Sequence, residues 1–102
     1  MIDRARIADL KSEVGEEDFD EIVALFLEET EETVGALFQT NDPADLSALF
    51  HNLKGSALNL GLSEFSTQCA KGEALPQSVS PQQARTSFLA ARAALLANAP
   101  VA

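Results

Sequence analysis

The chain has 102 residues, of which 16 are acidic and 7 basic, so its net charge is −9. That length suits one compact domain. The acidic balance argues against a nucleic-acid binder, which needs Lys and Arg to neutralise phosphates, and equally against an anionic membrane surface. Hydrophobic residues make up 46% of the chain, Gly and Pro are few, and Ala and Leu are abundant. This composition favours a folded helical domain.

The first two helices are predicted from apolar residues at helical spacing. A short helix covers about residues 3–14, with Asp3 as its N-cap and Gly15 at its end. An amphipathic helix then runs from about residue 17 to residue 39, with most of its acids off the apolar stripe and a local weak point at Gly35. The stripe of this second helix is Phe19, Ile22, Val23, Phe26, Leu27, Val34, Leu37 and Phe38.

Three further helices follow, each with recognisable end signals. One begins at Asp42-Pro43, an N-cap followed by a proline suited to the first helical position, and stops at Gly61. The next covers about residues 63–75, and the last opens with the capping box Ser80-Pro81-Gln82-Gln83 and reaches about residue 98. Their apolar stripes are Leu46, Leu49, Phe50, Leu53, Ala57 and Leu60, then Phe65, Cys69 and Gly72, then Ala84, Phe88, Ala91 and Leu95.

Four amphipathic helices with short connections predict an all-α fold, an antiparallel four-helix bundle with a short additional N-terminal helix at one end. We expect one domain over residues 1–102, with a core from about 3 to 98 and a flexible tail at 99–102. All six Phe are assigned to the core, and so is the thiol of Cys69, in preference to a Cys–His nucleophile. One His and one Cys are too few for a metal site, and the acids of the second helix are interpreted as a solvated face.

The cysteine content and the N-terminal sequence bear on location. Cys69 is the only cysteine, which excludes an internal disulfide and fits a reducing compartment. The first ten residues lack the apolar run of a signal peptide, and no stretch approaches the roughly 20 apolar residues of a membrane helix. We therefore expect a soluble, cytoplasmic protein.

The third predicted helix carries His51, the only histidine of the chain. At about 100° per residue, His51 lies about 200° from both Leu49 and Leu53, which point into the core, so the imidazole faces outward. Lys54 and Gly55 follow three and four residues later and are expected to lie exposed beside it. A glycine inside a helix costs about 1 kcal/mol relative to alanine, which suggests a close approach by another molecule.

These three residues suit phosphoryl transfer. A solvated imidazole is largely neutral at neutral pH, and its free lone pair is nucleophilic. Attack on a phosphoryl group would form an N-phosphohistidine, whose negative charge Lys54 would offset. The chain has no nucleotide-binding loop, so no autonomous kinase activity is expected and those parts must come from a partner. The alternative is that His51 is a solvated surface residue without a role.

The run from His51 to Gly61, HNLKGSALNLG, resembles the signature of histidine-containing phosphotransfer (HPt) domains. That family has a His-x-Leu-Lys-Gly-Ser core followed by a Leu-Gly step, and Cys69 followed by Glu73 resembles a further common feature. The resemblance is strongest over residues 42–75. Gly72 stands where the family usually has Leu before the acid, and we expect this departure to loosen the fourth helix locally.

The resemblance implies a phosphorelay carrier. His51 would accept a phosphoryl group from a receiver-domain aspartyl phosphate and pass it to another receiver, while Lys54 stabilises its charge and Gly55 leaves access. The implied partners are response-regulator receiver domains and a hybrid histidine kinase, and the implied cofactor, Mg²⁺, belongs to the receiver, with none in this chain. We expect a stand-alone monomer. The alternative is a non-phosphorylated helical adaptor that binds a receiver domain or a histidine kinase.

The surroundings of His51 along the chain are nearly uncharged. Between Leu46 and Ser63 the only formal charge is Lys54, so a neutral-to-basic window is expected, which would not repel the acidic active site implied for a receiver. Ala48 and Leu58 lie off the strict core stripe of the third helix. Two interpretations remain open for them: the border of a docking patch for a receiver helix, or buried edge residues.

Overall fold

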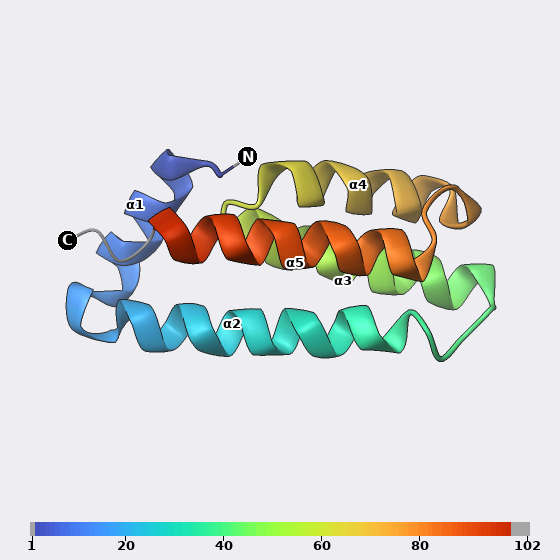
Figure 1. The fold of residues 1–102 in the computed structure, drawn as a ribbon, viewed down its shortest axis with the longest axis horizontal. Helices are drawn as coiled ribbons and strands as arrows, with labels where there is room; N and C mark the ends of the chain where they lie inside the picture. The colour runs from blue at the N-terminus through green and yellow to red at the C-terminus, as the bar shows by residue number, and fades with distance from the viewer. Residues whose placement is uncertain (1, 99–102) are drawn as a thin grey trace.

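The computed structural model describes residues 2–98 and contains five α-helices in that range. They are α1 (Arg4–Val14), α2 (Glu16–Ala36), α3 (Pro43–Asn59), α4 (Ser63–Ala74) and α5 (Pro81–Asn98), with a 3₁₀ turn over Pro76–Ser78. Helices α2 to α5 run antiparallel to their chain neighbours in one bundle, and α1 lies across one end (Figure 1). The predicted all-α bundle with an additional N-terminal helix is therefore confirmed. The predicted tail, 99–102, lies outside the described residues.

Most of the bundle core comes from the apolar stripes that the helical spacing predicts, and Leu62 and Val79, which lie in connections between helices, add to it. Cys69 is fully buried, and burial raises the pKa of its thiol to about 12, so the thiol stays protonated and unreactive at neutral pH, as predicted. No helix of the described part is long and apolar enough to cross a membrane. The buried hydrophobic residues are Leu10, Phe19, Val23, Leu27, Val34, Leu37, Phe50, Leu53, Ala57, Leu60, Leu62, Phe65, Cys69, Val79, Ala84, Phe88 and Leu95.

The predicted helix starts are confirmed by their capping bonds. Asp3 and Asp42 each accept a hydrogen bond from an amide of the first turn, at 3.1 and 2.9 Å. At the start of α5 the Ser80 amide donates to the Gln83 side chain at 2.8 Å, and the Gln83 amide donates to the Ser80 hydroxyl at 3.0 Å. This reciprocal pair satisfies two amides that the helix leaves without a partner.

The second helix is shorter than predicted at its C-terminus. α2 ends at Ala36, and the amides of the next three residues donate to carbonyls only three residues back, at 3.0–3.1 Å, which is a tight turn and not a continued α-helix. Gly35 lowers the helix propensity in this last turn. Phe38 lies beyond the helix end and is 45% exposed, so the assignment of all six Phe to the core is wrong for this residue.

α1 is attached to the corner between α3 and α4. The Asp3 amide donates to the Gly61 carbonyl at 2.8 Å, and Ile2 and Leu62 form an isolated antiparallel bridge. Gly61 has a φ of +69°, and a Cβ there would lie 2.8 Å from the Asp3 carbonyl oxygen. A residue with a side chain would therefore be strained and would push α1 away. The corner confirms Gly61 as the stop signal of α3.

Candidate functional site

His51 lies near the middle of α3 on the outside of the bundle. Its side chain is 68% exposed, whereas Phe50 and Leu53 on the same helix are buried. The outward orientation predicted from helical geometry is therefore confirmed. An imidazole placed in this way is open to a large partner, while the helix beneath it is held by its buried face.

One carboxylate on α4 contacts both polar side chains of the predicted site. Glu73 Oε2 lies 2.9 Å from His51 Nδ1, and Glu73 Oε1 lies 2.6 Å from Lys54 Nζ. The Lys54 side chain is 32% exposed, so it is partly covered and not fully exposed as predicted, because Glu73 draws its ammonium toward α4. The expected neutral-to-basic window around His51 also contains this acid, which reaches it from 22 residues further along the chain.

The position of Glu73 depends on a close contact between α3 and α4. A Cβ on Gly72 would lie 2.7 Å from three ring atoms of Phe50, so only glycine allows the ring to pack there. The Ser47 hydroxyl adds a hydrogen bond to the Glu73 carbonyl at 2.8 Å. α4 continues through Gly72 to Ala74, so the expected local loosening is not found. Gly72 instead brings the two helices together and places Glu73 beside His51.

Electrostatics at Glu73 determine which nitrogen of His51 carries the proton. The Lys54 ammonium and the His51 ring, both hydrogen-bonded to Glu73, hold the pKa of that carboxyl below its usual range. Glu73 is therefore ionised at neutral pH, and a carboxylate only accepts hydrogen bonds. His51 Nδ1 must then be the donor, so the neutral ring keeps its free lone pair on Nε2.

The lowered pKa of Glu73 predicts a pH dependence of stability. The folded state favours the ionised form of Glu73. The contribution of this preference to folding stability is therefore complete above the ordinary carboxyl pKa of 4.5, and it is lost as the pH falls through the lower pKa that Glu73 has in the folded state. We expect Glu73→Gln to be less stable than the parent at pH 7, with the difference narrowing below pH 4.5. Urea unfolding followed by circular dichroism measures this. A difference that stays constant over that range, or that Glu29→Gln on the exposed face of α2 reproduces, would contradict it.

The surface next to His51 is open on the side of Gly55. A Cβ on Gly55 would meet no atom within 4 Å, so the packing of this chain does not require a glycine there. Ala48 and Leu58 are both exposed, which excludes the interpretation that they are buried edge residues. The other interpretation, that they border a docking patch for a receiver helix, stays a prediction. Along α3, the exposed imidazole of His51 therefore has Gly55, which carries no side chain, and the small or apolar side chains of Ala48 and Leu58 as neighbours.

Comparison with known protein families agrees with this geometry. A family model described as Hpt domain matches residues 21–99, which is more than half of the chain and includes the run from His51 to Gly61. No curated protein matches the chain, and no solved structure matches it. Hpt domains carry out histidine phosphotransfer in phosphorelays and interact there with receiver domains and kinases. With its all-helical bundle and its exposed His51, the chain belongs to the Hpt domain family.

Proposed function

We propose that the protein is a stand-alone, monomeric phosphorelay carrier of the cytoplasm that holds a phosphoryl group on His51 between two receiver domains. The observation that carries the proposal is the exposed imidazole of His51, with Nδ1 held by Glu73 and Nε2 free. Family membership supports the reaction class. Upstream, a hybrid histidine kinase would load the first receiver, because the chain contains no nucleotide-binding loop.

The transfer step follows from the hydrogen bond at Nδ1. The Nε2 lone pair of His51 attacks the phosphorus of a receiver aspartyl phosphate, an N–P bond forms, and the P–O bond to the aspartate breaks. The aspartate leaves with the electron pair as a carboxylate. The ring gains positive charge while Nδ1 keeps its proton, and the Glu73 carboxylate at 2.9 Å offsets that charge. The reverse sequence delivers the group to the second receiver.

Lys54 and the receiver share the neutralisation of the phosphoryl charge in this proposal. Lys54 Nζ is bound to Glu73 before transfer and lies one helical turn from His51, within reach of a group attached to the ring. The Mg²⁺ that phosphoryl transfer commonly needs would be bound by the receiver. This chain's own part is to present the nucleophile, hold its proton at Nδ1 and supply one cation.

Loss of the Lys54 charge is expected to slow transfer without unfolding the domain. Lys54→Ala should reduce the rate of phosphoryl transfer by roughly tenfold or shorten the lifetime of the phosphohistidine, because one stabilising cation is removed. Quenched-flow transfer from a labelled receiver gives the rate, and circular dichroism reports the fold. Lys71→Ala, which removes the same charge from the exposed side of α4, is the matched control. An unfolded Lys54→Ala variant, or equal rates for the two variants, would contradict the role.

We expect Gly55 to make helix α3 less stable than alanine would and to leave room for a receiver to approach His51. Gly55→Ala should stabilise the helix by up to about 1 kcal/mol, because alanine is the better helix former and nothing blocks its Cβ. The same methyl group should slow transfer, because it occupies the surface that a receiver approaches. Gly35→Ala on α2 has equally open space and should gain stability with an unchanged transfer rate. Unchanged transfer in Gly55→Ala would show that access does not depend on the glycine.

The proposed function is tested with the intact chain and phosphorylated receivers of the same organism. The expected result is transfer of the label to the chain as an acid-labile, alkali-stable product, followed by its release to a second receiver. Absence of label from every receiver in a full panel would reject the proposal. Receiver binding without any transfer would support the non-phosphorylated adaptor in its place.

A further inference from the structure

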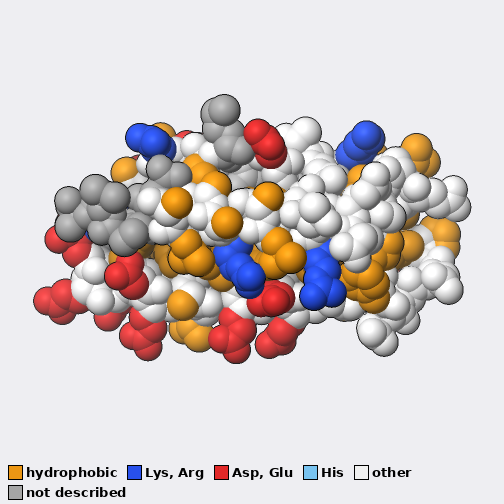
Figure 2. Space-filling view, viewed as in Figure 1, with side chains coloured by type: hydrophobic (Ala, Val, Ile, Leu, Met, Phe, Trp, Pro, Cys, Tyr) orange, Lys and Arg blue, Asp and Glu red, His pale blue; other side chains and the backbone are white. Residues whose placement is uncertain are grey.

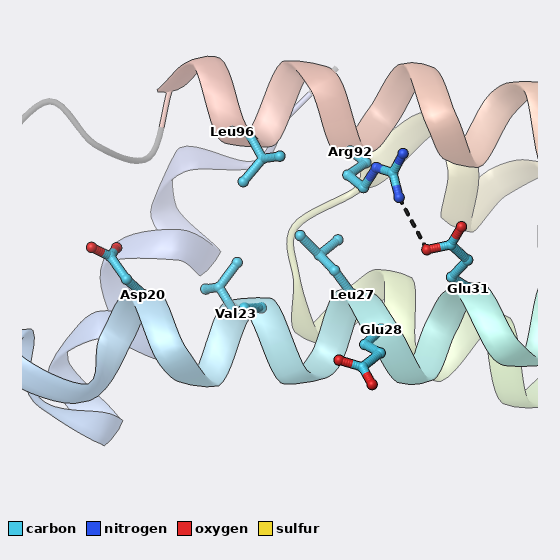
Figure 3. Close-up of a pocket in the computed structure, with 8 residues that line it drawn as sticks. Asp20, Val23, Leu27, Glu28, Glu31, Arg92 and Leu96 are labelled. Carbon is cyan, nitrogen blue, oxygen red and sulfur yellow. Dashed lines mark hydrogen bonds and ion pairs between the residues drawn. The ribbon is translucent and has the colours of Figure 1, made fainter.

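A groove runs along the seam between α2 and α5. It has a volume of about 460 Å³, and its apolar lining comes from Val23, Ala24 and Leu27 on α2 and from Leu96 on α5. Figure 3 shows Val23 and Leu27 pointing toward α5 and Leu96 pointing back toward α2. Leu96 is 51% exposed although it faces this groove. Val23 and Leu27 are buried at the floor of the groove, so the apolar surface that the bundle leaves uncovered along this seam comes from Ala24 and Leu96.

The apolar seam continues beyond the ion pair between Arg92 and Glu31. These two side chains are joined at 3.1 Å across the groove, and both are partly exposed. On the other side lies a second hollow of about 180 Å³, lined in part by Phe38 and Leu89. Of the six large hydrophobic side chains exposed in the described part, three (Leu96, Leu89 and Phe38) line one of these two hollows.

The residues of α5 that line the two hollows are spaced so that a helix of a partner can pack along them. Arg85, Leu89, Arg92 and Leu96 follow one another at intervals of four, three and four residues, so they share one face of the helix. That face spans about 17 Å, or three helical turns. A helix that places apolar side chains at the same three- and four-residue intervals would fill both hollows at once.

The two walls of the groove differ strongly in charge. α2 carries nine acidic residues and no basic one, and Asp20, Glu28 and Glu31 stand on the groove itself. α5 carries two arginines and no acid. Figure 2 shows acidic side chains along the edge formed by α2, with basic groups and hydrophobic patches over the seam above it. A ligand for this groove needs apolar groups at its centre and positive charge toward α2.

We propose that the α2–α5 groove is a docking site for a cationic amphipathic helix of a partner protein. The apolar face of that helix would fill the two hollows, and its Lys or Arg residues would face Asp20, Glu28 and Glu31. A second copy of this chain fits poorly, because its net charge of −9 would meet the same acidic wall. The proposal goes beyond phosphoryl transfer, because His51 lies at the contact between α3 and α4 and no histidine is visible on the face in Figure 2.

The probe is a labelled synthetic peptide of about 18 residues, with leucines on one helical face and lysines elsewhere. A peptide of identical composition with its leucines scattered around the helix controls for plain charge attraction. Fluorescence anisotropy at physiological ionic strength measures binding to the intact chain. The groove variant is Leu96→Lys, and the matched control is Leu25→Lys, a residue of α2 that is 50% exposed and lines neither hollow. Both substitutions add one positive charge to an exposed position.

The proposal predicts that the amphipathic peptide binds and that Leu96→Lys weakens binding about tenfold or more, with a change within about twofold for Leu25→Lys. The scattered peptide should bind at least about tenfold more weakly than the amphipathic one. No binding, equal binding of both peptides, or equal effects of the two variants would overturn the proposal. Sedimentation that shows a dimer dissociated by Leu96→Lys would assign the groove to a second copy. His51→Gln should leave peptide binding unchanged, so this test fails or succeeds independently of the phosphotransfer assay.

Discussion

Replacement of His51 by glutamine is expected to abolish phosphoryl acceptance and leave the fold unchanged. An amide nitrogen has no nucleophilic lone pair, so no N–P bond forms. The His51 side chain is 68% exposed and contributes no core packing, and the glutamine amide can still donate a hydrogen bond to Glu73. Label transfer from a phosphorylated receiver and thermal unfolding measure the two expectations.

The matched control for this variant is Asn52→Gln, which changes the exposed neighbour of His51 on the same helix. It should accept the phosphoryl group as well as the parent does. Label that persists in His51→Gln would place the acceptor elsewhere. If His51→Gln keeps both partner binding and signalling output, the non-phosphorylated adaptor is the correct function.

Substitution of Gly72 by alanine is expected to destabilise the domain by about 1–3 kcal/mol, the usual effect of overpacking a core contact. Its Cβ would lie 2.7 Å from the Phe50 ring, so either the ring or α4 must move. Displacement of α4 also shifts Glu73 away from His51 Nδ1. We therefore expect slower phosphoryl transfer together with the loss of stability, measured by urea unfolding and by transfer from a labelled receiver.

Gly35→Ala separates this packing effect from helix propensity. Both substitutions replace a helical glycine by a better helix former, but a Cβ on Gly35 meets no atom within 4 Å. Gly35→Ala should therefore gain stability where Gly72→Ala loses it. If both variants gain stability and transfer at the parent rate, the Gly72–Phe50 contact does not position Glu73.

Most of the bundle is predictable because its helices are amphipathic and well capped. Apolar spacing identifies nearly every buried residue, and Asp3, Asp42 and the Ser80–Gln83 box mark three helix starts correctly. The end of α2 is the main error, because apolar spacing continues through Phe38 after the backbone has tightened into turns. Spacing reports which residues could share a face, whereas local hydrogen bonds decide where a helix ends.

The candidate site is predictable only as far as it lies on one helix. His51, Lys54 and Gly55 are neighbours on α3, so their spacing alone brings them together. Glu73 reaches them from α4, and its distance to His51 depends on how closely two helices pack at Gly72. The resemblance to the family pattern singled out Glu73 as the acid that follows Cys69. Residue spacing within one helix could not predict that Glu73 contacts His51, because the two residues lie on different helices. The charge that surrounds His51 is therefore set by tertiary packing, and the net charge of the local segment does not determine it.

More than half of the acidic residues of the chain lie on one helix. α2 holds nine of the 16 acids, and it forms one wall of the α2–α5 groove, whereas His51 lies where α3 meets α4. Glu73, the acid that contacts His51, is itself paired with Lys54 at 2.6 Å. The acids of α2 thus belong to a helix outside the α3–α4 contact at which His51 lies, and Asp20, Glu28 and Glu31 among them line the proposed docking groove.

The most direct test of the central proposal is to locate the phosphoryl group on the imidazole ring. After phosphorylation by a receiver, nitrogen-15 and phosphorus-31 NMR of the labelled chain distinguish the two ring nitrogens. We predict a phosphoryl group on Nε2 of His51, with Nδ1 still protonated and bonded to Glu73. Phosphorylation of Nδ1, or of any residue other than His51, would contradict the account.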